Sequence, residues 1–305
     1  MPLRIANSVD VRAGLRLRGL IGRDDVVHFH TSRAHALAPF CQGGHARLVV
    51  TRRMDYVPRG GPYARWLYNR AVDVVIAISE GVREALVRGG VRAERIRVVP
   101  SGIDPAAVQA SAGAGEAHRR AWGIAPDDVL VLVLGALERR KGHAILLAAA
   151  RRLETAQPRL RYVLCGAGSA EAALRRLAGP LRGTVVFAGQ QTDVGGCLAA
   201  ADIVAMPSLK EGLGVAALEA MAAERPVVAS RVGGLAEAVV DGESGLLVTP
   251  GDPAPLADAI AALIADPALR RRLAEAGRAR VLARYTAARM ADGTLACYGE
   301  PPCAA

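Results

Sequence analysis

Short runs of β-branched and apolar residues alternate with helical stretches along most of the chain, in two series. In the first series, strands are predicted at 26–30, 47–51, 73–79 and 96–100, and a helix at 81–90 ends in glycine. The second series has predicted strands at 128–135, 161–166, 184–189, 202–208 and 226–231, with helices near 142–155, 169–178, 193–200, 214–224 and 234–240. This alternation predicts an α/β protein whose parallel sheets are covered by helices.

The two series are separated by residues 101–117, which are rich in proline, glycine, alanine and serine and contain no predicted strand. Such a composition is typical of a linker, and we place a domain boundary there. The prediction is an N-terminal Rossmann-like domain over 1–105, a C-terminal one over 106–285, and a final helix and tail over 286–305. The two parallel sheets are expected to face each other across a cleft.

The composition fits a globular protein of a reducing compartment. No apolar run reaches the roughly 18 residues that span a bilayer, and no signal peptide is recognised, so a cytoplasmic location is expected. The five cysteines contain no CxxC pair, which argues against a disulfide framework or a zinc site. The net charge of +10 comes without a nucleic-acid motif. It favours anionic substrates or peripheral contact with an anionic membrane, and no nucleic-acid partner is expected.

Ligands of such sheets bind beyond the carboxyl ends of the strands, so the loops there are candidate sites. In "MPSLKEGLGVAALEAMA" (206–222), Ser208 and Glu211 follow a strand, and glycines open a helix whose N-terminus favours phosphate or sugar oxygens. A segment helical throughout would hold Glu211 and Glu219 about 12 Å apart, a span that suits the two ends of a nucleotide-sugar. Glu219 has apolar neighbours, which favours a cleft position with ribose hydroxyls as partners over an exposed helix position.

Two further loops carry candidate residues. Arg139, Arg140 and Lys141 follow another predicted strand, where they would attract a diphosphate unless they form a solvated basic turn. His28 and His30 alternate on one strand and therefore face the same side, with His30 nearer the carboxyl end. Both remain candidates for either a core or a site position. A metal pair would need a third ligand, which the sequence does not show, and no metal site is predicted.

Together these motifs resemble the GT4-type retaining glycosyltransferases of the GT-B fold, over roughly residues 24–299. The most specific feature is the E-x7-E pattern of Glu211 and Glu219, supported by "RIRVVPSGID", "GALERRKGH", "PVVASRVGGLAEAV" and "DGESGLLV". The resemblance implies transfer of a sugar from a nucleotide-sugar, UDP- or GDP-linked, with retained anomeric configuration and without a cofactor or an essential metal. The expected acceptor is an envelope glycolipid or polysaccharide, as in lipopolysaccharide biosynthesis, and it would be met at the inner membrane face.

The resemblance also assigns roles to residues. Glu211 would contact the donor sugar, Lys141 would neutralise the leaving diphosphate, and His30, with His28 as the alternative, would reach the sugar. Donor binding would further involve Glu219 at the ribose, Arg140, Ser208, Gly212, Leu213 and Gly214 near the sugar and diphosphate, and Gln190 near the base. The segment 286–299 looks like the one that returns to the N-terminal domain in this family.

Two departures from the family pattern stand out. Ala136 occupies a position where the family usually has arginine. The strand at 26–30 lies so near the N-terminus that the family's opening strand and glycine-rich loop are not found, and we expect an incomplete N-terminal domain with an exposed strand edge. A truncated, non-catalytic nucleotide-sugar-binding homologue is therefore the alternative function. A phosphorylase is disfavoured because it needs a lysine for pyridoxal phosphate, and only Lys141 and Lys210 are present.

Overall fold

The chain folds into two compact units. The structure, a computed structural model, describes residues 4–7, 10–23, 25–43, 45–58, 61–181 and 184–299. Unit 1 comprises Met1–Ser101 and Ala288–Ala305, and unit 2 comprises Gly102–Ala287. Cys303 and the rest of the predicted tail from 300 onward lie outside the described residues. No helix in the described part of the chain is long and apolar enough to cross a membrane.

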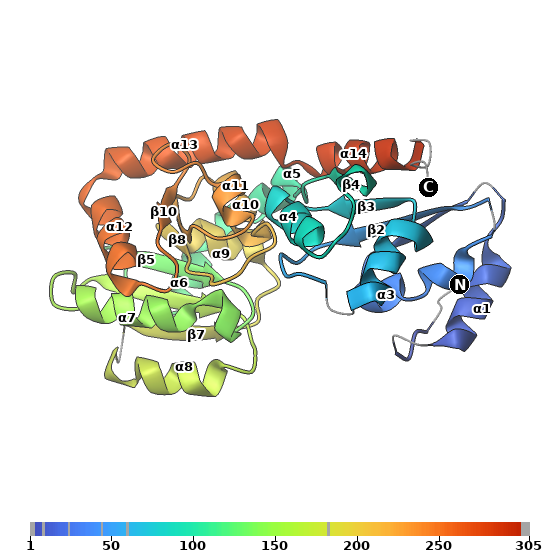
Figure 1. Cartoon of the computed structure of the whole chain (residues 1–305). Helices are drawn as coiled ribbons and strands as arrows, with labels where there is room; N and C mark the ends of the chain where they lie inside the picture. The colour runs from blue at the N-terminus through green and yellow to red at the C-terminus, as the bar shows by residue number, and fades with distance from the viewer. Residues whose placement is uncertain are drawn as a thin grey trace. The chain divides into compact units, whose positions relative to one another are not determined.

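Unit 1 contains a parallel sheet in the order β1-β2-β3-β4 (Figure 1). Its strands are β1 (Val26–Phe29), β2 (Arg47–Arg52), β3 (Val74–Ala77) and β4 (Ile96–Val98). Its helices are α1 (Val11–Leu20), α2 (Ser32–His35), α3 (Gly61–Trp66), α4 (Glu80–Arg88) and α14 (Ala287–Gly299), with shorter turns η1 (Ala38–Cys41), η2 (Leu67–Ala71) and η3 (Ala93–Arg95). Within the described sheet β1 and β4 are the edge strands.

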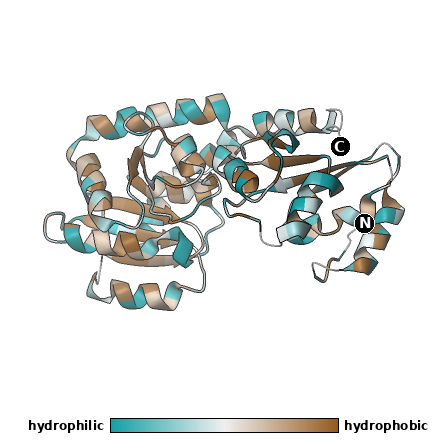
Figure 2. Cartoon of the chain, in the orientation of Figure 1, coloured by the Kyte–Doolittle hydropathy of each residue, from teal (hydrophilic) through white to brown (hydrophobic). Residues whose placement is uncertain are grey.

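The final helix α14 is part of the core of unit 1. Cys297 packs in a buried cluster with Val49, Val74, Ile76 and Val99, which come from three of the strands or their ends. The Arg47 Nε donates a hydrogen bond of 2.8 Å to the Cys297 carbonyl. Figure 2 shows these strands as hydrophobic ribbons. Strand burial therefore depends on residues from both ends of the chain.

Unit 2 contains a parallel sheet in the order β10-β9-β8-β5-β6-β7. Its strands are β5 (Val129–Leu134), β6 (Leu160–Cys165), β7 (Val185–Gly189), β8 (Ile203–Met206), β9 (Val227–Ser230) and β10 (Leu246–Val248). Its helices are α5 (Pro105–Ala110), α6 (Gly115–Ala121), α7 (His143–Leu153), α8 (Glu171–Ala178), α9 (Val194–Ala200), α10 (Val215–Ala222), α11 (Leu235–Ala238), α12 (Pro253–Ala265) and α13 (Pro267–Arg284), with turns η4 (Ala112–Ala114), η5 (Arg139–Lys141) and η6 (Gly179–Leu181). This is a doubly wound sheet whose strand order reverses between β5 and β8.

Helices cover the sheet of unit 2 through a layer of buried aliphatic side chains. Val131, Val133 and Ile203 belong to a cluster with residues of α7 and α12, which pack against each other. Successive residues of a strand point to opposite faces, and the intervening Leu130 and Leu132 are fully buried as well. Both faces are therefore covered, which explains why the strands read as continuous apolar runs.

The boundary between the units falls at the start of 101–117, between Ser101 and Gly102, but the interpretation of the rest of this segment as a linker was wrong. The segment forms α5, η4 and the start of α6, and these elements pack against α9 and α10 inside unit 2. Three other helices, α1, α2 and α3, were not predicted either. Alanine and glycine in 101–117 allow helices to pack closely. A composition that is typical of linkers therefore forms packed helices here.

Arg119 of α6 anchors this region to the amino-terminal edge of the sheet. Its guanidinium donates to the carbonyl oxygens of Ala200 at 2.9 Å, Ala125 at 2.9 Å and Asp128 at 2.6 Å. It also donates to the Asp202 carboxylate at 3.1 Å. One side chain thus satisfies four acceptors in two segments of the chain, 125–128 and 200–202.

We expect Arg119→Met to lower the free energy of unfolding by about 2–4 kcal/mol, because it leaves several half-buried acceptors without a donor. The neighbouring Arg120 is exposed, and Glu116 of the same helix is its one ion-pair partner in the part of the chain that the structure describes. Arg120→Met should therefore change stability by no more than about 0.5 kcal/mol. Urea unfolding of both variants measures the difference, and equal stabilities would contradict an anchoring role for Arg119.

Candidate functional site

An ion pair lies at the point where the strand order of unit 2 reverses. Lys141 ends the turn that follows β5, and Glu211 lies in the loop that follows β8. The Lys141 Nζ is 2.5 Å from the Glu211 Oε2, and the Ser208 hydroxyl donates to the same oxygen at 3.2 Å. Both charged side chains are largely buried. The structure therefore brings together three of the predicted site residues.

Backbone contacts hold these two loops against each other. The Leu209 amide donates to the Arg140 carbonyl at 2.7 Å. Gly142 caps α7 in the left-handed region, at φ 71°. A Cβ atom there would lie 1.8 Å from the Pro207 carbonyl oxygen. Only glycine fits this position, because both its backbone conformation and the close approach of the β8 loop exclude a side chain.

The helix predicted at 214–224 is α10, and Glu211 precedes it. Gly214 is the N-cap residue of α10, which begins at Val215. Glu211 is therefore in a loop, and the estimated separation from Glu219 along a continuous helix does not apply. A Cβ on Gly234 would lie 2.3 Å from the Gly212 carbonyl oxygen, so the glycines at 233–234 serve close packing of the two loops.

A cavity of about 420 Å³ opens beside this pair, beyond the carboxyl ends of β5, β6 and β7. Gln190, from the loop after β7, and Glu219, from α10, both line it. Gly135 lines it too, and a Cβ there would lie 3.7 Å from the Lys141 Cε, so the lysine stem lies close to one of the lining residues without lining the cavity itself. Ala136 contributes no charge to the lining.

Glu219 has an electrostatically costly position. Burial raises the pKa of its carboxyl above the ordinary value. No described residue donates a hydrogen bond to this carboxylate or pairs with it within 4.0 Å. The side chain also borders a second cavity of unit 2, of about 610 Å³, which Asp104, Ser111 and Asp193 help to line. A desolvated carboxylate between two cavities is typical of a ligand-binding position.

The other predicted basic residues differ in their surroundings. The Arg140 Nε donates to the Glu138 carboxylate at 2.8 Å, so a described residue already partners this cation. His143 follows Gly142 and is buried, and burial together with the Lys141 charge lowers its pKa to about 4. Near neutral pH the imidazole is therefore neutral, and Lys141 carries the positive charge at the end of this loop.

The two predicted histidines belong to unit 1. His28 contacts the Tyr298 hydroxyl with Nδ1 and the Thr51 hydroxyl with Nε2, each at 2.7 Å, and burial lowers its pKa to about 4. His30 is exposed, its ring lies 4.0 Å from that of His28, and its pKa is also lowered, mainly by burial. His28 thus ties β1 to β2 and α14, whereas His30 remains accessible. Among the described residues, no three potential metal ligands of the His, Cys, Asp or Glu type lie together.

The structure adds residues to the cavity that were not predicted, among them Cys165, Gln191 and Ala216. Gln191 has a signal in the sequence, because it follows a predicted strand directly after Gln190. Cys165 ends β6 and Ala216 lies on an apolar helix, and neither side chain has a chemistry that marks it as a site residue.

Two family models match the chain. The model described as "Glycosyl transferases group 1" matches residues 115–280, and "Glycosyltransferase Family 4" matches residues 1–107. Each match covers most of one unit.

Individual proteins agree with these matches. An alpha-maltose-1-phosphate synthase of Mycolicibacterium smegmatis is 35% identical over 88% of this chain and 72% of its own length. A D-inositol 3-phosphate glycosyltransferase of Stackebrandtia nassauensis is 38% identical over 68% of this chain but only 49% of its own length. The structure of Anabaena HepE in complex with UDP-glucose superposes with a TM-score of 0.85 at 25% identity, over 94% of this chain and 82% of that protein.

We expect Gly142→Ala to destabilise unit 2 by at least about 2 kcal/mol, because a Cβ at this left-handed position forces the β5 and β8 loops apart. Gly179 is the matched control. A Cβ added there would have no atom within 4 Å, and the backbone has an ordinary helical conformation. Gly179→Ala should leave stability unchanged or raise it slightly. Thermal unfolding compares the two, and a silent Gly142→Ala would show that the two loops are not held in this way.

Proposed function

Because the chain belongs to the group 1 glycosyltransferases, we propose that it transfers a sugar from a UDP- or GDP-sugar to an envelope glycolipid or polysaccharide acceptor. The observation that carries the proposal is the buried Lys141–Glu211 pair beside a cavity lined by Gln190 and Glu219. The site lies at the switch point of a doubly wound sheet, where such folds bind nucleotides. HepE, solved with UDP-glucose, favours uridine as the base.

In the proposed donor complex, the ribose hydroxyls donate to the Glu219 carboxylate. These hydrogen bonds replace the ones to water that the carboxylate loses on burial. Gln190 lies in the same cavity and is the proposed neighbour of the base. The diphosphate lies towards Lys141, with Arg140, Ser208 and the backbone of Gly212, Leu213 and Gly214 around it and the sugar. Both hydrogen bonds that described residues make to the Glu211 carboxylate use Oε2, so Oε1 is the proposed acceptor for a sugar hydroxyl.

The proposed reaction retains the anomeric configuration and requires no metal. The bond between the anomeric carbon and the diphosphate oxygen breaks, and its electron pair leaves with the diphosphate. The acceptor hydroxyl oxygen forms the new bond on the same face, and its proton passes to the departing phosphate. Lys141 stabilises the negative charge that develops there. His30 is the proposed contact with the sugar from unit 1.

The net charge of +10 supports peripheral attraction to an anionic membrane, where a lipid-linked acceptor would be met. This part of the proposal predicts that binding to anionic vesicles weakens as the salt concentration rises. A non-catalytic donor-binding protein is the alternative function.

Isothermal titration with UDP-, GDP- and ADP-sugars tests the donor site first. We expect one donor to bind, and Glu219→Ala to weaken that binding at least about tenfold. Glu275, an exposed glutamate on α13, provides the control, and Glu275→Ala should leave the affinity unchanged. Absence of binding to every donor would contradict the proposed function.

Transfer is then measured as release of the free nucleotide in the presence of candidate acceptors. Lys141→Ala should lower the rate by about a hundredfold or more, and EDTA should not affect it. Donor binding without release under any condition would favour the non-catalytic alternative.

Glu219→Gln should separate stability from binding. The carboxyl titrates at 4.5 in the unfolded chain and higher in the native protein. The buried charge therefore destabilises the native state only as the pH rises above 4.5, and fully above the native pKa. In the absence of donor we expect the variant to have a higher Tm than the parent at pH 8, with a difference that shrinks towards pH 4.5. At pH 8 the same variant should bind the donor more weakly. A lower Tm at pH 8 would show that the carboxylate has a stabilising partner.

A further inference from the structure

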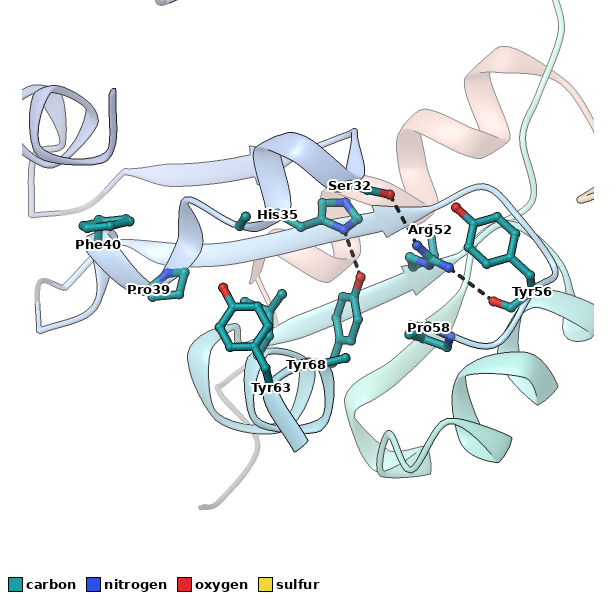
Figure 3. Close-up of a pocket in the computed structure, with 12 residues that line it drawn as sticks. Ser32, His35, Pro39, Phe40, Arg52, Tyr56, Pro58, Tyr63 and Tyr68 are labelled. Atoms are coloured by element: carbon teal, nitrogen blue, oxygen red, sulfur yellow. Dashed lines mark hydrogen bonds between the residues drawn. The ribbon is translucent and has the colours of Figure 1, made fainter. Parts of the chain in front are cut away.

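A cavity of about 770 Å³ lies within unit 1, and neither His28 nor His30 is among the described residues that line it. Its walls come from α2 and η1, from the loop after β2, and from α3 and η2. Most of the lining is apolar or aromatic, including Pro39, Phe40, Pro58, Tyr63 and Leu67 (Figure 3). A cavity of this size and lining fits a small organic ligand with an apolar body.

Arg52 is the charged side chain of this cavity. It is the last residue of β2, and only 5% of it is exposed. Its guanidinium makes two long hydrogen bonds, to the Ser32 hydroxyl at 3.5 Å and to the Tyr56 carbonyl at 3.3 Å, and it lies 4.9 Å from the centre of the Tyr56 ring (Figure 3). Its Nε has no hydrogen-bond partner among the described residues.

No described carboxylate lies within 4.0 Å of the Arg52 guanidinium. Two other titratable residues, His35 and Tyr68, are buried at the inner wall, and the His35 ring contacts the Tyr68 hydroxyl at 3.2 Å. Burial raises the pKa of Tyr68, and the Arg52 charge and a hydrogen bond from Arg52 act in the opposite direction. Burial, and next the Arg52 charge, lower the pKa of His35 to about 4, so it is neutral near pH 7. A buried cation without a counter-ion costs several kcal/mol, and an anionic ligand would remove that cost.

The mouth of the cavity is also apolar. Tyr56 and Tyr63 line it and are substantially exposed, and the neighbouring Val57 and Trp66 are exposed as well. Large apolar side chains gathered at a cavity entrance are typical of a binding surface rather than of an ordinary protein exterior. Among the described residues, the cavity thus has an apolar mouth, apolar walls and one buried cation, Arg52, at the inner wall.

We propose that this cavity binds an amphipathic anion, with its apolar body against Phe40, Pro58 and Tyr63 and its phosphate or carboxylate at Arg52. We take this ligand to be the acceptor, an assignment that rests on the proposed function. The binding itself does not depend on it, because every residue of the cavity belongs to unit 1.

Isothermal titration tests the cavity with four probes: geranyl phosphate, hydrocinnamate, geraniol and inorganic phosphate. We expect geranyl phosphate or hydrocinnamate to bind at least about tenfold more tightly than geraniol or inorganic phosphate, because only the first two combine an apolar body with an anion. Tighter binding of geranyl phosphate would identify a lipid phosphate as the natural source, and tighter binding of hydrocinnamate would identify an aromatic acid.

Arg52→Gln should weaken binding of the better probe at least about 30-fold, because the buried charge pair is lost. Arg88 on α4 is exposed and pairs with Glu84, and Arg88→Gln should leave the affinity unchanged. If Arg52→Gln does not fold, Tyr63→Ala decides the question, because Tyr63 is half exposed and its removal spares the fold. That variant should weaken geranyl phosphate and geraniol about threefold to tenfold and leave inorganic phosphate unchanged.

Titration of each variant with UDP-glucose measures the donor affinity of unit 2 independently of the cavity. Retained donor affinity with lost probe affinity supports the cavity assignment. Failure of both anionic probes to bind, or equal affinities in the parent protein and folded Arg52→Gln, would overturn it. Probe binding in a protein that binds no nucleotide-sugar would retain the cavity assignment and reject the proposed function.

Discussion

The contact between Lys141 and Glu211 is the interaction around which the candidate site of unit 2 is arranged. It joins the loop after β5 to the loop after β8, and these loops are neighbours only because the strand order reverses between those two strands. A largely buried ion pair recovers its desolvation cost only with good geometry and additional hydrogen bonds. Ser208 supplies such a bond, and a single Glu211 oxygen accepts both donors.

Backbone contacts, independent of the two charges, hold the loops that carry this pair. The Leu209 amide bonds to the Arg140 carbonyl, and Gly142 lets the chain pass against the Pro207 carbonyl. Neither contact involves a charged side chain. The geometry of the pair would therefore persist when a ligand competes for Lys141, since the loops do not need the ion pair to hold them. That property suits a lysine whose charge serves a bound anion, because the positive charge is available without a change of fold.

The strands and the loops that carry the site were predictable because their signals are local. β5 was expected at 128–135 and spans Val129–Leu134, since a strand buried on both faces is a continuous apolar run. The packing of α5 and α6 was not predictable from composition. Gly115 lies so close to α9 that a Cβ would be 2.8 Å from the Ala199 carbonyl carbon, so small residues mark close helix contacts there rather than a linker. Contacts such as that between His28 and Tyr298, 270 positions apart, leave no local signal at all.

Glu219 and Arg52 carry opposite charges but lie in similar positions. Each is substantially buried, each lines a cavity, and neither has a described counter-ion. A charge held in this way destabilises the ligand-free protein, and the lost free energy returns when a ligand of complementary chemistry binds. The surroundings decide which chemistry that is. The glycines and glutamines around Glu219 offer backbone and amide groups to a polar hydroxylated ligand, whereas the aromatic walls around Arg52 exclude such a ligand and accept an anion with an apolar body. In a chain that transfers a sugar, two sites of such different polarity would keep the donor and the acceptor from occupying each other's place.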